Sequence, residues 1–260
     1  STPKPSSAAS DVYKRQTQSG LKTSLSLPVL GEPGFNEGRG SNNWVIAGSN
    51  TASGKPLLAN DPHLALSTPA VWYVTHLKTA NTDVIGASLP GIPLVVIGHN
   101  SKVAWGFTNT GPDVQDLYLE QIDPSNPTRY KTPTGWQDFE TRIETIAVKG
   151  QPDIKHAVRI TRHGPVLSDA QATHAEVLDL SRFVLALRWS ALDQDNRTLV
   201  AGFKAHQAQS VDELLAAHAD NHSPTQNIVM ADIQGNVAYK AAGRVPLRGA
   251  QNDIRGVAPS

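Results

Sequence analysis

The sequence of 260 residues contains no cysteine, which excludes disulfide bonds, thiolate nucleophiles and cysteine-ligated zinc. It has no excess of charge, because 23 Lys and Arg residues balance 23 Asp and Glu residues. A protein that binds nucleic acid through bulk charge would show a basic excess or stripe. No apolar run approaches the ~18 residues of a membrane-spanning helix, and the start of the chain lacks a signal peptide's apolar core. The composition therefore predicts a soluble, globular protein with neither nucleic acid nor a membrane span among its partners.

Several motifs of well-known enzyme classes are also missing. The sequence has no G-x-S-x-G, no G-x-x-x-x-G-K-[ST], no G-x-G-x-x-G and no H-E-x-x-H. Esterase triads, P-loop phosphate chemistry and zincin hydrolysis therefore have no support. Among the nine histidines, only His218 and His222 are four residues apart. They are either a zinc pair or, as we favour, two surface histidines near the end of a helix.

The first forty residues differ in texture from the rest of the chain. Residues 1–20 are rich in Ser, Thr, Lys and Pro and predict a disordered or foreign segment. Residues 21–40 end in a stretch, 30–40, that has four Gly and one Pro and predicts an exposed, deformable linker. Residues 41–260 carry the patterns of regular structure and are predicted to form the folded part.

Strand patterns dominate after residue 40, and helical patterns are few. Residues 199–207 have weak helical spacing, and Ser210 followed by Glu213 is a capping box that predicts a helix over 210–217. Strands in groups with helices inserted late predict an α+β fold with largely antiparallel sheets. The strands are predicted at residues 43–47, 56–59, 71–77, 94–97, 116–122, 142–149, 156–162, 184–189, 228–231 and 236–239.

The peptide between Gly40 and Ser41 stands at the junction of the linker and the first strand. A serine hydroxyl beside an exposed Gly–Ser peptide can attack the preceding carbonyl, and hydrolysis of the resulting ester would free the α-amine of Ser41. That amine has a reference pKa of ~7.7–8.0, so part of it is an uncharged base near neutral pH that can activate the hydroxyl. Taken alone, a Gly-Ser pair before a strand is ordinarily a turn.

An ordered series of motifs follows the Gly40–Ser41 peptide. The motifs are GSNNWVI at 40–46, NDPHL at 60–64, PGIP at 90–93, GHN at 98–100, AWGFTN at 104–109, DVQD at 113–116, RHGPVL at 162–167 and NIVMAD at 227–232. In order and spacing, from residue 41 to about 248, this series resembles the penicillin acylase family of N-terminal-nucleophile hydrolases. The resemblance implies a four-layer αββα fold, incomplete in this chain. It also implies a hydrolase of linear amides, acting on carbon–nitrogen bonds other than peptide bonds.

The resemblance implies roles for individual residues. Ser41 matches the nucleophile, which is released by cleavage after Gly40. Asn227 matches the family Asn whose side-chain amide donates to the tetrahedral oxyanion, and Asn109 falls where a backbone N–H is the second donor. Such donors together contribute a few kcal/mol of transition-state stabilisation.

Two further catalytic positions follow from the same resemblance. His63 falls at a position that is His in cephalosporin- and acyl-homoserine-lactone-type members and Gln in penicillin G-type members, and it is expected beside the Ser41 amine. Read from its own loop alone, it is an ordinary loop histidine. Arg248 lies near the family Arg that hydrogen-bonds around the nucleophile, with Arg244 as an adjacent candidate.

A structural calcium ion is implied at residues 113–116. Asp113 and Asp116 match carboxylates that bind calcium in this family, and the Gln115 carbonyl lies beside them. Oxygen ligands of this kind suit Ca²⁺, which takes six to eight of them, so other ligands must come from elsewhere. The alternative interpretation is a solvated acidic turn before the strand at 116–122.

The predicted function is an amide hydrolase that cleaves itself at Gly40–Ser41. It would then hydrolyse N-acyl amides through a serine acyl-enzyme. The acyl group belongs to β-lactam side chains or acyl-homoserine lactones, and His63 favours the latter or cephalosporin-type side chains. The resemblance further implies a fragment, inactive alone, whose partners are an α-subunit segment and the rest of the β-subunit, in a periplasmic or secreted protein. The competing hypothesis is a non-catalytic β-rich binding or scaffold domain that has lost processing.

Overall fold

The computed structural model describes residues 40–64, 67–249 and 258–259. The predicted segment 1–20 and the linker up to residue 39 lie outside the described residues. The described residues form two compact units. The larger unit comprises residues 40–115 and 189–247, and the smaller unit comprises residues 116–188 and those from 248 onward. Within the described part of the chain, no helix is long and apolar enough to cross a membrane.

A six-stranded antiparallel sheet forms the centre of the larger unit, with strand order β15-β14-β6-β5-β4-β3. Glycine permits a close contact between β4 and β5, because a Cβ on Gly98 of β5 would lie 2.3 Å from the Ile85 carbonyl oxygen of β4. The strands are β3 (Tyr73–Lys78), β4 (Asp83–Ser88), β5 (Ile97–Asn100), β6 (Val103–Asn109), β14 (Gln226–Asp232) and β15 (Val237–Ala242).

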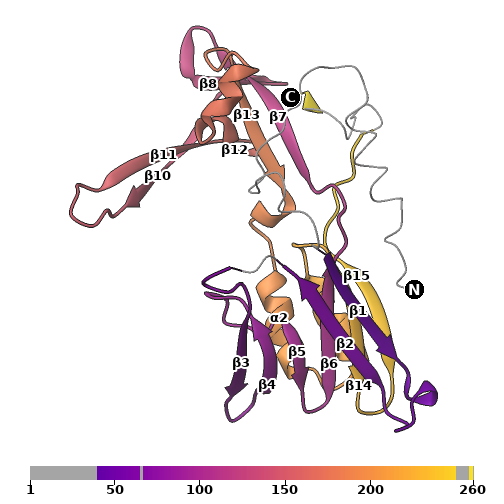
Figure 1. The fold of residues 1–260 in the computed structure, drawn as a ribbon. Coiled ribbons are helices and arrows are strands. Elements are labelled where there is room, and N and C mark those ends of the chain that lie inside the picture. The colour runs from indigo at the N-terminus through magenta and orange to yellow at the C-terminus, as the bar shows by residue number, and fades with distance from the viewer. Residues whose placement is uncertain (1–39, 65–66, 250–257, 260) are drawn as a thin grey trace. The chain divides into compact units, whose positions relative to one another are not determined.

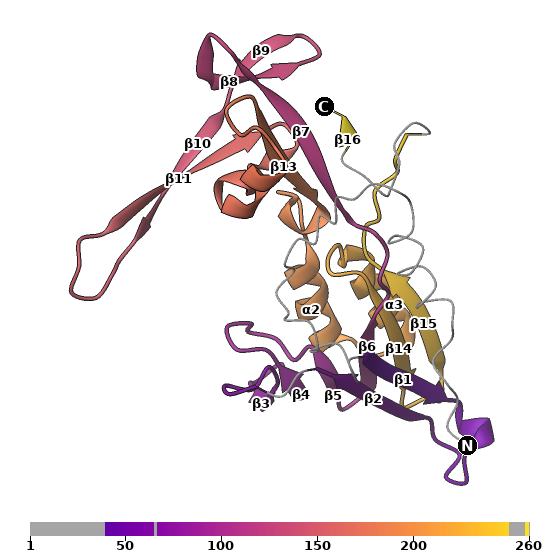
Figure 2. The same cartoon turned by 45° about the horizontal axis from the view of Figure 1, so that its top comes forward.

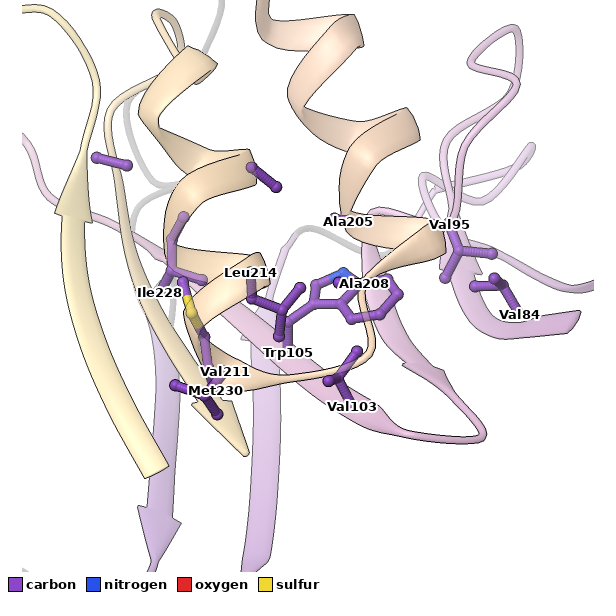
Figure 3. Packing of buried hydrophobic residues seen from close by; sticks show 12 residues of the cluster. Val84, Val95, Val103, Trp105, Ala205, Ala208, Val211, Leu214, Ile228 and Met230 are labelled. Carbon is purple, nitrogen blue, oxygen red and sulfur yellow. The ribbon is translucent and has the colours of Figure 1, made fainter. Parts of the chain in front are cut away.

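Two helices, α2 (Thr198–Gln207) and α3 (Val211–Ala217), cover one face of this sheet, and the 3₁₀ turn η5 (His218–Asp220) follows α3 directly. The predicted cap is confirmed, because the Ser210 side chain accepts the Glu213 N–H at 3.2 Å. Trp105 of β6 lies in the centre of the apolar core between sheet and helices (Figure 3). The core thus fixes β6 and β14 beneath the helices.

A two-stranded antiparallel sheet of β1 (Gly40–Ile46) and β2 (Leu57–His63) packs on the opposite face, against β6 and β14 (Figure 1 and Figure 2). The approach is close, because a Cβ on Gly106 would lie 2.9 Å from the Asn60 side chain. A 3₁₀ turn, η1 (Gly48–Asn50), lies on the path from β1 to β2. The larger unit therefore has a helical layer, a large sheet and a small sheet.

The smaller unit is built mainly from antiparallel strands, including a long exposed hairpin, β10–β11, while β16 pairs in parallel with β7. Two residues of β7 contact the motif at 162–167. Oε1 of the buried Glu120 lies 2.7 Å from His163 Nδ1, and the Tyr118 ring stacks on the His163 imidazole. The elements of this unit are β7 (Gln115–Asp123), β8 (Asn126–Thr132), β9 (Gly135–Asp138), β10 (Glu140–Ile146), β11 (Ile154–Thr161), β12 (Gly164–Pro165), η2 (Leu167–Asp169), η3 (Ala172–Glu176), β13 (Phe183–Trp189) and β16 (Ala258–Pro259), with η4 (Ser190–Leu192) following in the larger unit.

The structure confirms nine of the predicted strands and both helices, with shifts of a few residues at their ends. The strand predicted at 94–97 is wrong, because Leu94 and Val95 are irregular and β5 begins only at Ile97. Leu94 and Val95 are buried, at 6% and 2% exposure, which accounts for the apolar run. An apolar run indicates burial, but it does not distinguish a strand from a buried connection.

Candidate active site

Ser41 is the second residue of β1 and lies opposite Pro62 of β2. It is partly buried and lines a cavity of about 320 Å³ in the larger unit. Asn109 at the end of β6 and Gln226 at the start of β14 line the same cavity, and the Gln226 amide donates to Asn109 Oδ1 at 2.7 Å. The predicted nucleophile and the adjacent ends of β6 and β14 therefore line one mainly apolar cavity.

Amide side chains fix β1 on the large sheet. Asn43 Nδ2 donates to the backbone oxygens of Gly106 and Asn227, each at 3.2 Å. Asn60 of β2, the register partner of Asn43, donates to the carbonyl oxygen of Asn42 at 3.0 Å and to that of Phe107 at 2.9 Å, so it ties β1 and β2 to β6. Because strands rise about 3.3 Å per residue, Ser41 lies about 6.6 Å along β1 from the residue that contacts Asn227.

The backbone N–H of Asn109 points away from β14. Thr110 N–H donates to the Thr225 carbonyl, and hydrogen-bonded pairs alternate in an antiparallel ladder, so Asn109 occupies a position without ladder bonds to β14. The N–H of Phe107, two residues earlier and directed to the same edge, is accepted by Asn60 Oδ1 at 2.6 Å. The Asn109 N–H therefore points away from β14, toward the edge of β6 at which Asn60 of β2 accepts the Phe107 N–H.

The side chain of Asn227 is oriented by two neighbours. Tyr239 of β15 donates its hydroxyl hydrogen to Asn227 Oδ1 at 2.6 Å. Asn227 Nδ2 donates to Thr108 Oγ1 at 3.3 Å. Since an amide nitrogen carries two hydrogens, this arrangement leaves one N–H for another acceptor. The tyrosine fixes which end of the amide is the donor.

The other two predicted catalytic residues, His63 and Arg248, each contact a carboxylate. His63 lies opposite Gly40 in the register, and its Nε2 lies 2.7 Å from Asp61 Oδ2 on the exposed side of β2. Arg248 belongs to the smaller unit, where its Nε donates to both carboxylate oxygens of Asp116 at 3.0 and 3.1 Å. The alternative, Arg244, forms a bidentate pair with Asp195, at 2.9 Å for each bond.

The segment predicted to bind calcium contains Asp113, Gln115 and Asp116. Both oxygens of Asp116 accept from Arg248. In the part of the chain that the structure describes, no cluster of three or more His, Cys, Asp or Glu residues could hold a metal ion. The residues present therefore do not make a complete calcium site by themselves, since Ca²⁺ takes six to eight oxygen ligands.

The two histidines expected at the surface are both buried, so that expectation is wrong. His218 is 3% exposed and lines the cavity beside Ser41, and His222 Nδ1 accepts the Arg197 N–H at 3.3 Å. Burial, aided by the positive charge of Lys240, lowers the pKa of His218 to about 4. The imidazole is therefore neutral at physiological pH. Nor does the pair hold a metal ion with a third His, Cys, Asp or Glu ligand among the described residues.

Sequence reasoning missed the residues that orient the site. Asn60 lies within a recognised motif, but its role depends on contacts with a strand 47 residues away. Tyr239 was part of a predicted strand and carried no other signal. Alternation along that strand places residue 239 on the same face as 237 and 241, yet only the sheet order shows which neighbour it meets.

Comparisons with known proteins agree with the predicted resemblance. A family model described as penicillin amidase matches residues 4–260. The acyl-homoserine lactone acylase QuiP of Pseudomonas aeruginosa is 37% identical over 225 residues, which are 85% of this chain and 26% of that protein. The penicillin acylase 2 proenzyme of a Pseudomonas species is 32% identical over 83% of this chain and 27% of its own length. The chain thus spans about a quarter of the length of the curated relatives it matches.

A solved structure shows the same fold. The thermostable penicillin G acylase from Alcaligenes faecalis superposes with a TM-score of 0.71 at 30% identity, covering 84% of this chain and 38% of that one. The predicted α+β, N-terminal-nucleophile hydrolase fold is therefore confirmed. The family match over nearly the whole chain, together with this fold, leads to one conclusion: the chain belongs to the penicillin amidase family.

Proposed function

We propose that the protein containing this chain is an amide hydrolase whose nucleophile is Ser41, freed by self-cleavage after Gly40. The observation that carries the proposal is the convergence of Ser41 and Asn109 on one apolar cavity, with β1 tied to Asn227 by Asn43. Cavities of this size, about 300 Å³ or more, accommodate small molecules. The acylase names of the relatives support the same reaction class.

The proposed reaction uses few side chains. Ser41 Oγ attacks the carbonyl carbon of the substrate amide while its proton passes to the Ser41 α-amine. The resulting oxyanion accepts hydrogen bonds from Asn227 Nδ2 and the Asn109 N–H. Collapse of this intermediate expels the substrate amine, which takes the proton, and leaves an ester on Ser41. A water molecule then hydrolyses that ester and releases the carboxylic acid.

The proposed substrates are N-acyl amides, either acyl-homoserine lactones or the acylated side chains of β-lactams. The apolar walls of the cavity fit an acyl group better than a charged one, since burial of an unpaired charge is costly. Several similar relatives are named acyl-homoserine lactone acylases, which supports the first class. We further propose that the protein acts in the periplasm or outside the cell, and cell fractionation tests this location.

A structural calcium ion remains part of the proposal. Asp113, the Gln115 carbonyl and Asp116 would supply some of its ligands, and the others would come from residues beyond those described. Such an ion would act on stability and would not take part in the reaction.

The test compares Ser41→Ala with Ser49→Ala, an exposed serine in η1, in the full-length protein. The proposal predicts that only Ser41→Ala abolishes both the cleavage seen on denaturing gels and the hydrolysis of acyl-homoserine lactones. Retained turnover in Ser41→Ala would overturn it. A protein that is never cleaved, hydrolyses none of these amides and still binds them would instead support the non-catalytic binding domain.

A further inference from the structure

One side chain in the cavity next to Ser41 is ionisable, unlike the other described residues that line it. The walls are mainly apolar, with Leu94, Phe107 and Leu199 among them. His218 of η5 is an ionisable side chain buried in this wall, at 3% exposure. Neither of its ring nitrogens has a hydrogen-bond partner within the described residues.

Most other polar side chains of the cavity already have hydrogen-bond partners; one exception is Trp72, whose Nε1, a donor only, is also buried without a partner among the described residues. Thr198 donates to Asn196 and accepts two backbone N–H groups, from residues 222 and 223. The Asn221 amide donates to the Pro224 carbonyl at 3.1 Å, and the Gln226 amide is bonded to Asn109. The contrast matters, because buried polar groups are nearly always hydrogen-bonded and an unpaired one requires an explanation.

The surroundings of His218 explain why the imidazole is neutral, but they provide no hydrogen-bond partner for it. The imidazole and the Phe107 ring make an edge-to-face contact, with 5.4 Å between their centroids. Lys240 opposes protonation through its charge, while its own Nζ donates to the Leu215 carbonyl at 3.1 Å. A neutral imidazole has one N–H donor and one acceptor nitrogen, so it can bond either a hydroxyl or a keto oxygen.

We propose that His218 is a specificity-determining residue that hydrogen-bonds a hydroxyl or keto substituent carried on the acyl chain of the substrate. This inference rests on the proposed amide hydrolase, because it assigns a substrate class to the same cavity. An unsubstituted acyl chain would leave the imidazole unpaired, whereas a chain with one oxygen substituent would pair it. Sites built around such a polar group discriminate against analogues that lack its partner.

The experiment measures kcat/KM of the full-length protein on acyl-homoserine lactones of one chain length. They are unsubstituted or carry a hydroxyl or keto group at successive carbons. For the wild type we expect a preference for one substituted chain of about twofold to twelvefold, the range of a single hydrogen bond. His218→Leu should abolish this preference, and His218→Asn, which keeps a donor and an acceptor, should retain part of it. Ile92→Val, which changes cavity volume without changing polarity, should leave the preference as it is.

The outcomes separate the two proposals. If no amide is hydrolysed by the wild type, the proposed function fails. If all chains are hydrolysed but the wild type has no preference, or His218→Leu changes kcat/KM for substituted and unsubstituted chains equally, the function stands and the role of His218 is refuted. The second result would assign His218 to packing or to a buried water.

Discussion

Replacing Tyr239 with Phe removes one hydroxyl and tests how the candidate oxyanion donor is oriented. The lost bond is the 2.6 Å contact to Asn227 Oδ1. Tyr239 is 61% exposed, so its bond contributes about 0.5–1.5 kcal/mol net. If that free energy selects the amide orientation with Nδ2 toward the oxyanion, its loss lowers kcat about 2- to 12-fold. KM should change little, because the donor acts on the transition state.

The assay is steady-state kinetics on a hydrolysed acyl-homoserine lactone, with thermal unfolding measured in parallel. Tyr73→Phe is the matched control, since Tyr73 is 66% exposed and lies on β3 at the opposite edge of the same sheet. Asn227→Ala should lower kcat about 100- to 1,000-fold. Adding Tyr239→Phe to Asn227→Ala should have no further effect, because residues that act through one another are not additive. An equal loss in both backgrounds would refute the orienting role.

Three other predictions concern stability. Asn60→Ala removes three hydrogen bonds between β2, β1 and β6 and should lower the free energy of unfolding by about 2–3 kcal/mol in chemical denaturation, and an unchanged midpoint would contradict this. The unfolded chain protonates His218 near the ordinary pKa of 6.5 and the folded chain only near 4, so stability falls as the pH falls through this window. Between pH 7.5 and pH 5 the wild type should lose about 2 kcal/mol more than His218→Leu, and equal losses would show that the buried imidazole does not titrate in this way. Removal of calcium with a chelator should lower the melting temperature and be reversed by Ca²⁺ but not Mg²⁺, whereas a protein that contains no calcium by elemental analysis would exclude the ion.

The sequence predicts the strands and helices of this chain well where a local pattern decides them. Alternation in 116–122 predicts β7, and the capping box at Ser210 predicts the start of α3. The segment 94–97 is different, because a buried connection and a buried strand have the same apolar composition. His218 shows the same limit for a polar residue, since nothing in its neighbours along the chain indicates that it packs against the Phe107 ring.

The same distinction between local patterns and long-range contacts applies to the candidate site. Ser41, Asn109 and Asn227 are identified by motifs that lie close to each of them in sequence. The bonds that hold them in place span far greater separations, such as the 184 residues between Asn43 and Asn227. Such contacts depend on the sheet order β15-β14-β6 and on the packing of β1 over it, which no local pattern specifies.

The central claim is that one serine supplies both a nucleophilic oxygen and the amine that activates it. Mass spectrometry of the purified full-length protein measures this directly, by the N-terminal residue of any chain produced after folding. The account predicts a chain that begins with an unmodified Ser41, and its absence in Ser41→Ala. Full hydrolytic activity in a protein whose Gly40–Ser41 peptide remains intact would contradict it.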